Sequence, residues 1–328
     1  MSKISIIGAG AWGTTLSIIT AENKHAVNLW SYEKDVADAI NEVHENKKYL
    51  NGFQLPQNIE GLNDIAKAAD AEIIIFATPS QYLRDTLQNI SRFIKKESVI
   101  VSAVKGLEIE TQKTMSTVIK EEVPTNNMAV ISGPNISKEI ARGLPAATVV
   151  ASKSLEAAKT VQKALNSNRF RVYTNTDVIG TEIGGALKNV IAIAAGVADG
   201  LTLGNNAKAA LMVRGIAEIT RLGVAMGGKT ETFSGLSGIG DLITTCSSTL
   251  SRNHFVGMEI AKGRKLKDII TKMYDVAEGV PTAKAARELA KKNNVDMPIT
   301  EEVYQVLYEN KDPFKAISSL MQRDLKNE

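Results

Sequence analysis

The sequence predicts an α/β fold: a Rossmann-type, doubly wound, mostly parallel sheet followed by an all-α domain. Strand and helix patterns alternate from the start of the chain to about residue 175, which is typical of a parallel sheet with helices on both faces. A glycine-rich turn directly follows the first strand pattern, and after Thr176 the strand patterns stop. We therefore expect a dinucleotide-binding domain over residues 1–178 and a helical substrate and catalytic domain over residues 179–328.

The chain opens with a strand, a glycine-rich turn, a helix and a second strand. Residues 3–7 have the pattern of a short buried strand, and the turn Gly8-Ala-Gly-Ala-Trp-Gly13 follows directly. Helical spacing over residues 14–22 and a strand pattern over residues 26–30 complete the unit. A GxGxxG motif in this context is typical of dinucleotide binding, whereas the same glycines elsewhere would make an ordinary turn.

Each glycine of the motif has a separate task. Gly8 permits the tight turn, Gly10 lets a pyrophosphate approach the backbone, and Gly13 lets the helix pack closely on the strand. The helix N-terminus supplies N–H donors and a dipole that favours phosphate. We therefore predict that this domain binds NAD(H) or NADP(H).

The end of the second strand bears on the choice between these two cofactors. An acidic residue there holds the ribose 2′-hydroxyl of NAD, and an arginine holds the 2′-phosphate of NADP. The segment Ser31-Tyr32-Glu33-Lys34 offers Glu33 and no arginine, which leans slightly to NAD. The alternative is that Glu33 is a solvated charge in the first turn of a helix.

The rest of the first domain alternates between strand and helix patterns. Further strands are predicted at Glu72–Thr78, Val99–Ala103, Met128–Ser132, Ala147–Ala151 and Arg169–Tyr173. Helices are predicted at Gln81–Lys95, Thr111–Glu122 and Leu155–Leu165, and the polar stretch Asn41–Asn58 is expected to be a helix end and a loop.

Three of these strands end in residues that suit a ligand site. Pro79 follows the strand at 72–78, Lys105 follows the next, and Gly133-Pro134-Asn135 follows the third. Ligands of open α/β sheets bind at the carboxyl ends of the strands. Lys105 is therefore a candidate binding residue, with an ordinary surface lysine as the alternative.

The most informative stretch of the second domain surrounds Lys188. Its neighbours from Thr181 to Gly196 are almost all small or apolar, so the ammonium needs a partner or a lowered pKa. Gly184 lies one helical turn before Lys188, and the small residues there let another backbone or a ligand approach. The alternative is a core helix whose lysine extends its ammonium to solvent.

A second glycine-rich segment ends in Asp241. Three glycines precede this aspartate, at the point where a helix is expected to begin. Asp241 can cap that helix, reach the Lys188 ammonium, or do both. Thr244 or Thr245 would lie one turn further on, and Cys246 is most simply a small buried hydrophobic residue.

Two further segments carry polar groups that suit a phosphate or a cofactor. In Ser251-Arg252-Asn253 the arginine can grip a phosphate and its neighbours add neutral hydrogen bonds, although an isolated Arg252 would make only a surface ion pair. Glu278 lies in the turn Val276-Ala-Glu-Gly before a helix. The long helices of this domain are predicted at Val178–Gly200, Ala207–Met226, from Asn253, Pro281–Asn293 and Ile299–Tyr308.

The amino-acid composition limits the classes of protein to which this chain could belong. A net charge of +3 with dispersed basic residues gives no sign of nucleic-acid binding. One cysteine excludes an intrachain disulfide and a cysteine-cluster zinc site, and three scattered histidines make a metal site unexpected. No signal-peptide pattern and no transmembrane segment are expected, because the longest apolar run, 190–203, is short and interrupted. We expect a cytoplasmic protein.

The ordered motifs of the whole chain resemble those of the NAD(P)-dependent glycerol-3-phosphate dehydrogenase family in its soluble bacterial form. The motifs that carry the resemblance are Gly8-Ala-Gly-Ala-Trp-Gly-Thr-Thr-Leu, Val104-Lys-Gly-Leu-Glu, Ser132-Gly-Pro-Asn, Ala186-Leu-Lys-Asn-Val, Gly238-Ile-Gly-Asp-Leu, Thr245-Cys, Ser251-Arg-Asn and Glu278-Gly. Two departures stand out: Ala11 occupies a position where many relatives have serine, and Ser31-Tyr32-Glu33 lacks a common basic residue.

The resemblance implies roles for individual residues. Lys188 corresponds to the proton acceptor, Asp241 to the acidic residue beside it, and Asn189 and Thr245 to polar neighbours. Substrate-binding positions correspond to Lys105, Gly133, Asn135, Lys188, Asp241, Ser251, Arg252 and Asn253. Cofactor positions correspond to Ala11, Trp12, Tyr32, Lys105, Ser137, Arg252, Val276 and Glu278. The glycines at 8, 10 and 13 and the strand-end residue Pro79 join this predicted cofactor site because of their place in the sequence pattern.

The implied reaction interconverts sn-glycerol 3-phosphate and dihydroxyacetone phosphate, with Lys188 as general acid and base and no metal. Burial lowers the pKa of such a lysine and Asp241 raises it, which would leave it able to exchange a proton. The resemblance also implies a homodimer and a role in supplying glycerol 3-phosphate for phospholipid synthesis. Two alternatives stay open: a dehydrogenase of a β-hydroxyacid or sugar acid, and a non-enzymatic NAD(H) sensor.

Overall fold

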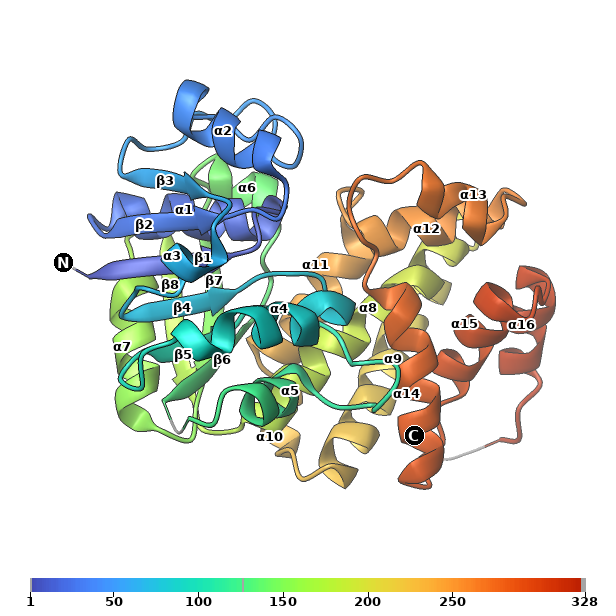
Figure 1. Ribbon diagram of the computed structural model, residues 1–328. Coiled ribbons are helices and arrows are strands. Elements are labelled where there is room, and N and C mark those ends of the chain that lie inside the picture. Colours follow the sequence, from blue (N-terminus) through green and yellow to red (C-terminus); the bar gives the residue numbers. More distant parts are fainter. Residues whose placement is uncertain (1, 126, 326–328) are drawn as a thin grey trace.

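Eight strands form one sheet in the N-terminal half of the chain (Figure 1). The computed structural model describes residues 2–125 and 127–325. In chain order the strands are β1 Lys3–Ile7, β2 Ala26–Trp30, β3 Ile59–Leu62, β4 Ile73–Phe76, β5 Val99–Ser102, β6 Met128–Ser132, β7 Ala146–Ala151 and β8 Phe170–Asn175. The sheet order is β3-β2-β1-β4-β5-β6-β7-β8, and every neighbouring pair is parallel except β6 and β7. The predicted doubly wound, mostly parallel sheet is confirmed.

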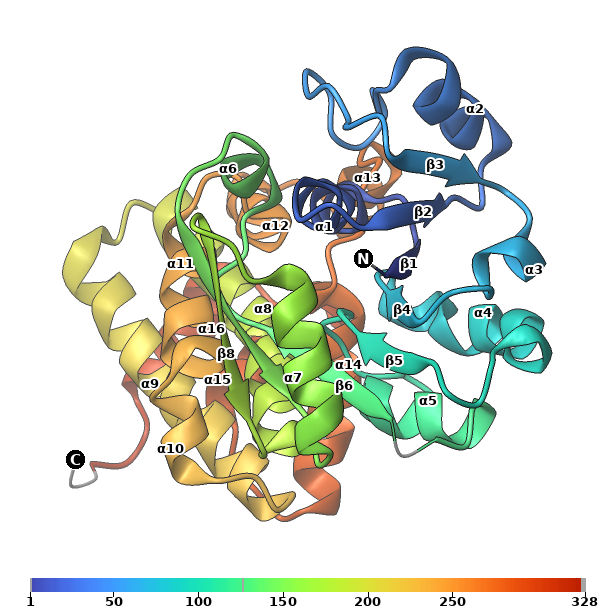
Figure 2. The same ribbon diagram turned by 90° about the vertical axis from the view of Figure 1, so that its left-hand side faces the viewer.

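Helices cover both faces of this sheet, because the strands carry apolar side chains on each face. One core packs β1 against α1, α6 and α7, and the other packs β4 against α3, α4 and α5 (Figure 2). These helices are α1 Ala11–Glu22, α3 Ile65–Ala68, α4 Leu83–Ile90, α5 Met115–Glu122, α6 Ser137–Ala141 and α7 Leu155–Leu165; α2, Lys34–Val43, packs against β3.

The sequence interpretation missed some local structure in this domain. The strand β3 was not predicted, since four residues that include Gly61 and Glu60 give little strand signal. Helix α1 begins at Ala11, directly after the turn, rather than at Thr14. The predicted helix over 81–95 is α4 between two short 3-10 turns, η1 Ser80–Tyr82 and η2 Ser91–Phe93.

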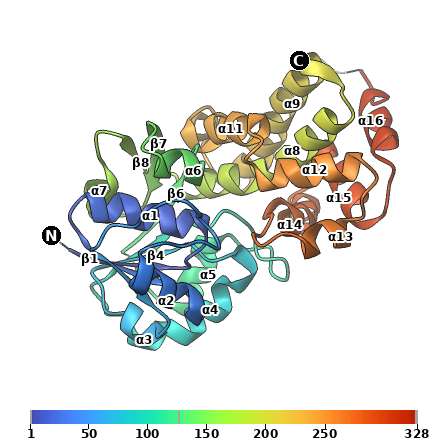
Figure 3. The same cartoon turned by 90° about the horizontal axis from the view of Figure 1, so that it is seen from above.

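The C-terminal half is helical, as predicted, and α8 is its central element (Figure 3). Helix α8, Val178–Gly200, packs against β6 at one end and against α9, α11, α12 and α14 along its length. The other elements are α9 Gly204–Ala225, α10 Thr230–Phe233, the π-helical turn η3 Leu236–Gly240, α11 Asp241–Ser247, α12 Arg252–Ala261, α13 Leu266–Thr271, α14 Gly279–Lys292, α15 Pro298–Tyr308 and α16 Pro313–Met321.

Helix α8 is a buried core helix. Among the described residues it is the one helix long and apolar enough to cross a membrane, but 89% of its most apolar 18-residue window is buried inside the protein. The apolar run considered in the sequence began only at residue 190, whereas the helix includes the small residues around Lys188 and reaches 23 residues. Its apolar side chains form a third core with those of α9, α12 and α14.

Candidate active site

Two lysines from different domains share the carboxylate of Asp241. Lys188 Nζ on α8 donates to Asp241 Oδ1 at 2.5 Å, and Lys105 Nζ, beyond the end of β5, donates to Asp241 Oδ2 at 2.7 Å. Lys188 also donates to Thr245 Oγ1 at 2.7 Å, and Lys105 to the Gly133 carbonyl at 2.8 Å. The Lys188 ammonium therefore does not extend to solvent, and 7% of the residue is exposed.

Small residues on α8 make this meeting possible. A Cβ atom on Gly184 would lie 2.4 Å from the Ser237 carbonyl oxygen, so only glycine lets α8 approach η3 this closely. The π-helical turn is closed by a hydrogen bond from Gly240 N–H to the Gly235 carbonyl at 3.1 Å. It delivers Asp241 to the first position of α11, where its side chain points to the lysines and forms no helix cap. π-Helical turns are frequent at functional sites.

The site contains two cationic side chains and one anionic one, all buried or nearly so. The pKa of Lys105 is lowered to about 8: burial is the main cause, the Asp241 carboxylate opposes it, and the neighbouring Lys188 ammonium adds to the lowering. An amine with this pKa changes its charge close to neutral pH, which suits a group that must hold an oxygen anion or move a proton.

Two amides extend the polar network toward α14. Asn253 Nδ2 donates to Asn189 Oδ1 at 2.9 Å, and Asn253 Oδ1 accepts the Gly279 N–H at 2.8 Å. Asn189 Nδ2 reaches the Lys105 carbonyl at 3.4 Å. The network therefore joins the start of α12 and the start of α14 to the residue that follows Lys188.

The glycine-rich turn has the geometry that a dinucleotide requires. Gly8 has φ +115°, and a Cβ on Gly13 would lie 1.9 Å from the Gly8 carbonyl oxygen, whereas a Cβ on Gly10 would meet nothing within 4 Å. The first helical hydrogen bond runs from Thr14 N–H to the Gly10 carbonyl, so three N–H groups precede it, and the first turn of α1 has no acidic residue. The buried indole N–H of Trp12 has no partner within the protein. These donors fit a pyrophosphate.

Glu278 connects the helical domain to the sheet edge. Its carboxylate accepts the Ser80 N–H at 2.8 Å and the Ser80 hydroxyl at 2.5 Å. Burial raises the pKa of this carboxyl, and the hydrogen bonds from Ser80 oppose that effect. Ser80 follows Pro79 at the carboxyl end of β4, so Glu278 lies where the sequence places the cofactor.

The remaining predicted site residues lie around this centre with differing partners. Arg252 Nη1 lies 3.3 Å from Asp275 Oδ1, and Ser251 Oγ caps α12 by accepting the His254 N–H. Asn135 Oδ1 accepts the Thr148 hydroxyl. The Ser137 carbonyl accepts from Thr15 on α1, Tyr32 is 84% exposed, and Val276 is 39% exposed. The structure thus brings Lys105, Lys188, Asp241 and Thr245 into one cluster, and it leaves Tyr32 and Val276 at the surface.

Both halves of the chain match models of one family. Residues 3–158 match the model described as the N-terminus of NAD-dependent glycerol-3-phosphate dehydrogenase, and residues 177–318 match the model of its C-terminus. The chain belongs to the NAD-dependent glycerol-3-phosphate dehydrogenase family. The family resemblance stated for the sequence is therefore confirmed.

Relatives of this glycerol-3-phosphate dehydrogenase family match over nearly the whole chain. A protein of Syntrophotalea carbinolica named glycerol-3-phosphate dehydrogenase [NAD(P)+] is 47% identical over 99% of this chain and 99% of its own length. One of Moorella thermoacetica with the same name is 48% identical over 98% of this chain and 96% of its own. The crystal structure of glycerol-3-phosphate dehydrogenase from Coxiella burnetii has a TM-score of 0.94 at 36% identity, covering 98% of this chain and 99% of that one.

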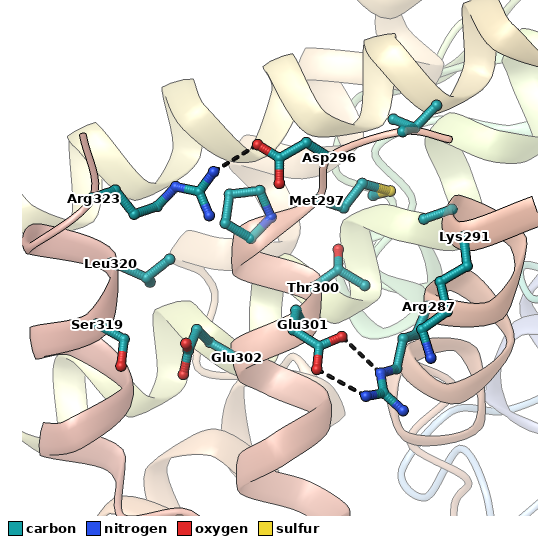
Figure 4. Close-up of a pocket in the computed structure, with 13 residues that line it drawn as sticks. Arg287, Lys291, Asp296, Met297, Thr300, Glu301, Glu302, Ser319, Leu320 and Arg323 are labelled. Atoms are coloured by element: carbon teal, nitrogen blue, oxygen red, sulfur yellow. Dashed lines mark hydrogen bonds and ion pairs between the residues drawn. The ribbon is translucent and has the colours of Figure 1, made fainter. Parts of the chain in front are cut away.

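A separate cavity lies away from the residues that this family's motifs indicate. It measures about 240 Å³ between α14, α15 and α16 and is lined by Arg287, Glu301 and Arg323 among others (Figure 4). Two ion pairs join residues of its lining, Arg287 with Glu301 and Arg323 with Asp296 (Figure 4). Among residues 2–125 and 127–325, no group of three or more His, Cys, Asp or Glu side chains is placed to hold a metal.

Sequence reasoning missed three residues that support the site. Ser80 is the partner of Glu278, Asp275 is the partner of Arg252, and Asn46 donates to the Ala9 carbonyl inside the glycine-rich turn. Ser80 lies beside Pro79 at a strand end, so its position alone was a signal. Asn46 and Asp275 lie in loops, where a sequence gives no indication of which residue faces inward.

Cys246 is fully buried, and burial raises the pKa of its thiol to about 12.

Proposed function

We propose that this chain interconverts sn-glycerol 3-phosphate and dihydroxyacetone phosphate with NAD(H) or NADP(H). The observation that carries the proposal is the cluster of Lys188, Asp241 and Lys105 at the carboxyl edge of a dinucleotide-binding sheet. Membership of the family, and relatives named glycerol-3-phosphate dehydrogenase [NAD(P)+], support the substrate and the cofactor. The activity corresponds to EC 1.1.1.94.

Lys188 is the proposed acid and base. In the reduction of dihydroxyacetone phosphate, its ammonium gives a proton to the C2 oxygen, and in the reverse reaction its amine takes that proton back. Asp241 holds the ammonium in position together with the Thr245 hydroxyl. Lys105 adds a second positive charge beside the same oxygen, where negative charge develops. Hydride transfer at C2 is the chemistry that a bound nicotinamide supplies.

The phosphate of the substrate is assigned to the start of α12. Arg252 offers a planar guanidinium, and 42% of its side chain stays exposed although it pairs with Asp275. Ser251, Asn253, Gly133 and Asn135 complete the proposed substrate site. The proposed cofactor site comprises Gly8, Gly10, Ala11, Trp12, Gly13, Tyr32, Pro79, Lys105, Ser137, Arg252, Val276 and Glu278. Asn189 is assigned with Thr245 to the support of Lys188.

Several broader assignments belong to the same proposal. The domain boundary is placed between residues 178 and 179, within the first turn of α8. A homodimer, a cytoplasmic location and a role in supplying glycerol 3-phosphate for phospholipid synthesis follow from the family resemblance. A small-molecule phosphate is the expected partner, and nucleic acid is not.

The test follows nicotinamide absorbance as NADH or NADPH is oxidised, with and without dihydroxyacetone phosphate, in wild type and Lys188→Ala. Oxidation should require the substrate and fall at least about 100-fold in the variant, because general acid catalysis is lost. Lys284→Ala, an exposed lysine on α14, is the matched control and should retain the wild-type rate. Thermal unfolding shows whether Lys188→Ala has folded.

Two outcomes would contradict the proposal in different ways. Cofactor binding without any turnover of dihydroxyacetone phosphate would contradict the substrate and favour a β-hydroxyacid or a sensor. Full activity in folded Lys188→Ala would contradict the assignment of Lys188 and leave the substrate in place.

A further inference from the structure

The loop between α2 and β3 is attached directly to the glycine-rich turn. Asn46, which is 1% exposed, donates through Nδ2 to the Ala9 carbonyl at 2.7 Å and to Thr14 Oγ1 at 2.8 Å. Its Oδ1 accepts the Tyr49 N–H at 3.2 Å. Residues just after Asn46 are therefore held at a set position relative to the turn that receives the pyrophosphate.

Lys48 and Tyr49 use that position to engage Glu33. Lys48 Nζ lies 2.8 Å from Glu33 Oε1, and the Tyr49 hydroxyl donates to the same oxygen at 2.7 Å. The Lys48 ammonium also lies 5.5 Å from the centroid of the Tyr49 ring. The hydrogen bond to Glu33 raises the pKa of Lys48, so this side chain carries its full charge at neutral pH. The Glu33 carboxylate is thus already matched by a cation.

This cluster lies at the end of β2, the place where dinucleotide-binding domains distinguish a ribose 2′-hydroxyl from a 2′-phosphate. The turn Ser31-Tyr32-Glu33 supplies no basic side chain of its own. Lys48 brings an ammonium there from a loop that is later in the chain, and 36% of its side chain is exposed and accessible to a ligand. An ammonium is a suitable point charge for a phosphate.

We propose that Lys48 binds the 2′-phosphate of NADP(H), and that Glu33, its partner in the free protein, accepts the 2′-hydroxyl of NAD(H). This inference rests on the proposed dinucleotide site. In the free protein Lys48 and Glu33 pair with each other. A cofactor 2′-phosphate replaces Glu33 as the partner of Lys48, whereas a 2′-hydroxyl donates a hydrogen bond to the Glu33 carboxylate. Both NADP(H) and NAD(H) can therefore bind. Cofactor preference is then set by the balance of one ion pair.

The test measures binding to the intact protein with two probes, adenosine 2′,5′-bisphosphate and adenosine 5′-monophosphate, by calorimetry. In Lys48→Gln the Kd for the bisphosphate should rise about tenfold, because one partly exposed charge contact to phosphate is lost. The Kd for the monophosphate should change far less. In Glu33→Gln the bisphosphate should bind several-fold more tightly, because the competing carboxylate is gone. The KM for NADPH should change in each variant as the Kd for the bisphosphate does, and the KM for NADH as the Kd for the monophosphate does.

Lys47→Gln is the matched control. Lys47 is adjacent in sequence, 69% of its side chain is exposed, and its ammonium lies 3.8 Å from Glu45. Equal losses for both probes in Lys48→Gln, or the same selective loss in Lys47→Gln, would overturn the inference. If wild type binds neither probe, the dinucleotide site itself is wrong. If both probes bind as expected but dihydroxyacetone phosphate is not reduced, only the proposed substrate fails.

Discussion

At the scale of single residues, the Asp241 carboxylate determines how Lys188 and Lys105 are arranged. Each of its oxygens accepts from a different lysine, one from the sheet edge and one from α8. Removing this carboxylate would leave two buried ammonium groups close together without an anion, which is strongly unfavourable. The Asp241 carboxylate therefore holds the pair of lysines together.

The pKa of Lys105 predicts how activity depends on pH. Because burial places this pKa near 8, the ammonium is charged below that pH and neutral above it. The kcat/KM for dihydroxyacetone phosphate should fall as pH rises through about 8, since kcat/KM reports ionisation of the free enzyme. Lys105→Arg retains its charge and should move the fall to higher pH. A flat wild-type profile between pH 7 and 10, or an unchanged profile in the variant, would contradict this prediction.

At the scale of elements, the β1–α1 turn separates a structural glycine from a binding glycine. Gly13 faces the Gly8 carbonyl so closely that no side chain fits, whereas the space beside Gly10 is open. The fold therefore requires a glycine at position 13, whereas at position 10 only a bound ligand requires the absence of a side chain.

Alanine substitutions test this distinction. Gly10→Ala should change the free energy of unfolding by less than about 1 kcal/mol but weaken NADH binding, because its Cβ occupies the space of the pyrophosphate. Gly13→Ala should destabilise the protein by about 1–3 kcal/mol. Urea unfolding and fluorescence titration with NADH measure the two effects. Equal stability losses in both variants would contradict the assignment.

A buried glutamate on α9 supports the start of α15. Glu218 is 1% exposed and accepts the Ile299 and Thr300 N–H groups. Burial raises its pKa to about 7, and the two backbone N–H groups oppose that effect. A raised folded-state pKa contributes stability that is present below the unfolded-state pKa, near 4.3, and is lost as pH rises through about 7.

Glu218→Gln should remove this pH dependence. Relative to the variant, wild type should lose on the order of a few kcal/mol of unfolding free energy between pH 5 and pH 8. Urea unfolding across that range measures the difference, and Glu60→Gln on the exposed side of β3 is the control. Parallel stability curves for wild type and Glu218→Gln would show that the carboxyl does not change its protonation there.

At the scale of the whole molecule, two glutamates of the helical domain accept hydrogen bonds from the sheet domain. Glu182 on α8 accepts the Ser116 N–H at 2.7 Å at the start of α5, and Glu278 does the same for Ser80 at the start of η1. Each carboxylate satisfies N–H groups that a helix start leaves without partners. The two halves of the chain are thereby joined at two points, Glu182 with Ser116 and Glu278 with Ser80.

Loss of the hydrogen bonds between Glu182 and Ser116, which join the two domains, should lower the free energy of unfolding. Glu182→Ala leaves the Ser116 N–H buried without a partner and its hydroxyl with only Thr114 Oγ1, which costs about 1–3 kcal/mol. Glu182→Gln keeps an acceptor oxygen and should lose less. Urea unfolding at pH 7 measures both, and an alanine variant as stable as wild type would show that the interface relies on apolar packing alone.

The fold class was predictable because its signals are local and repeated: buried strands, a glycine-rich turn and a change to helical spacing near Thr176. Lys188 and Asp241 were predictable as a pair because each is an isolated charge among small residues. The contact between Lys105 and Asp241 was not predictable, since it joins residues that are far apart in the chain. The pairing of Lys48 with Glu33 also depends on how a loop folds back, which no local pattern encodes.

The burial of α8 has a consequence for the synthesis of the chain. Its 23 residues leave the ribosome before most of the helices that cover it, and on the order of ten seconds of translation separate Gly200 from the end of α14 at Lys292. During that interval the nascent chain carries an apolar segment of membrane-spanning length. All eight strands of the sheet have been synthesised by then, and one of them, β6, packs against α8 in the folded protein. The strands that are synthesised first therefore include a packing partner for α8, the helix that carries Lys188.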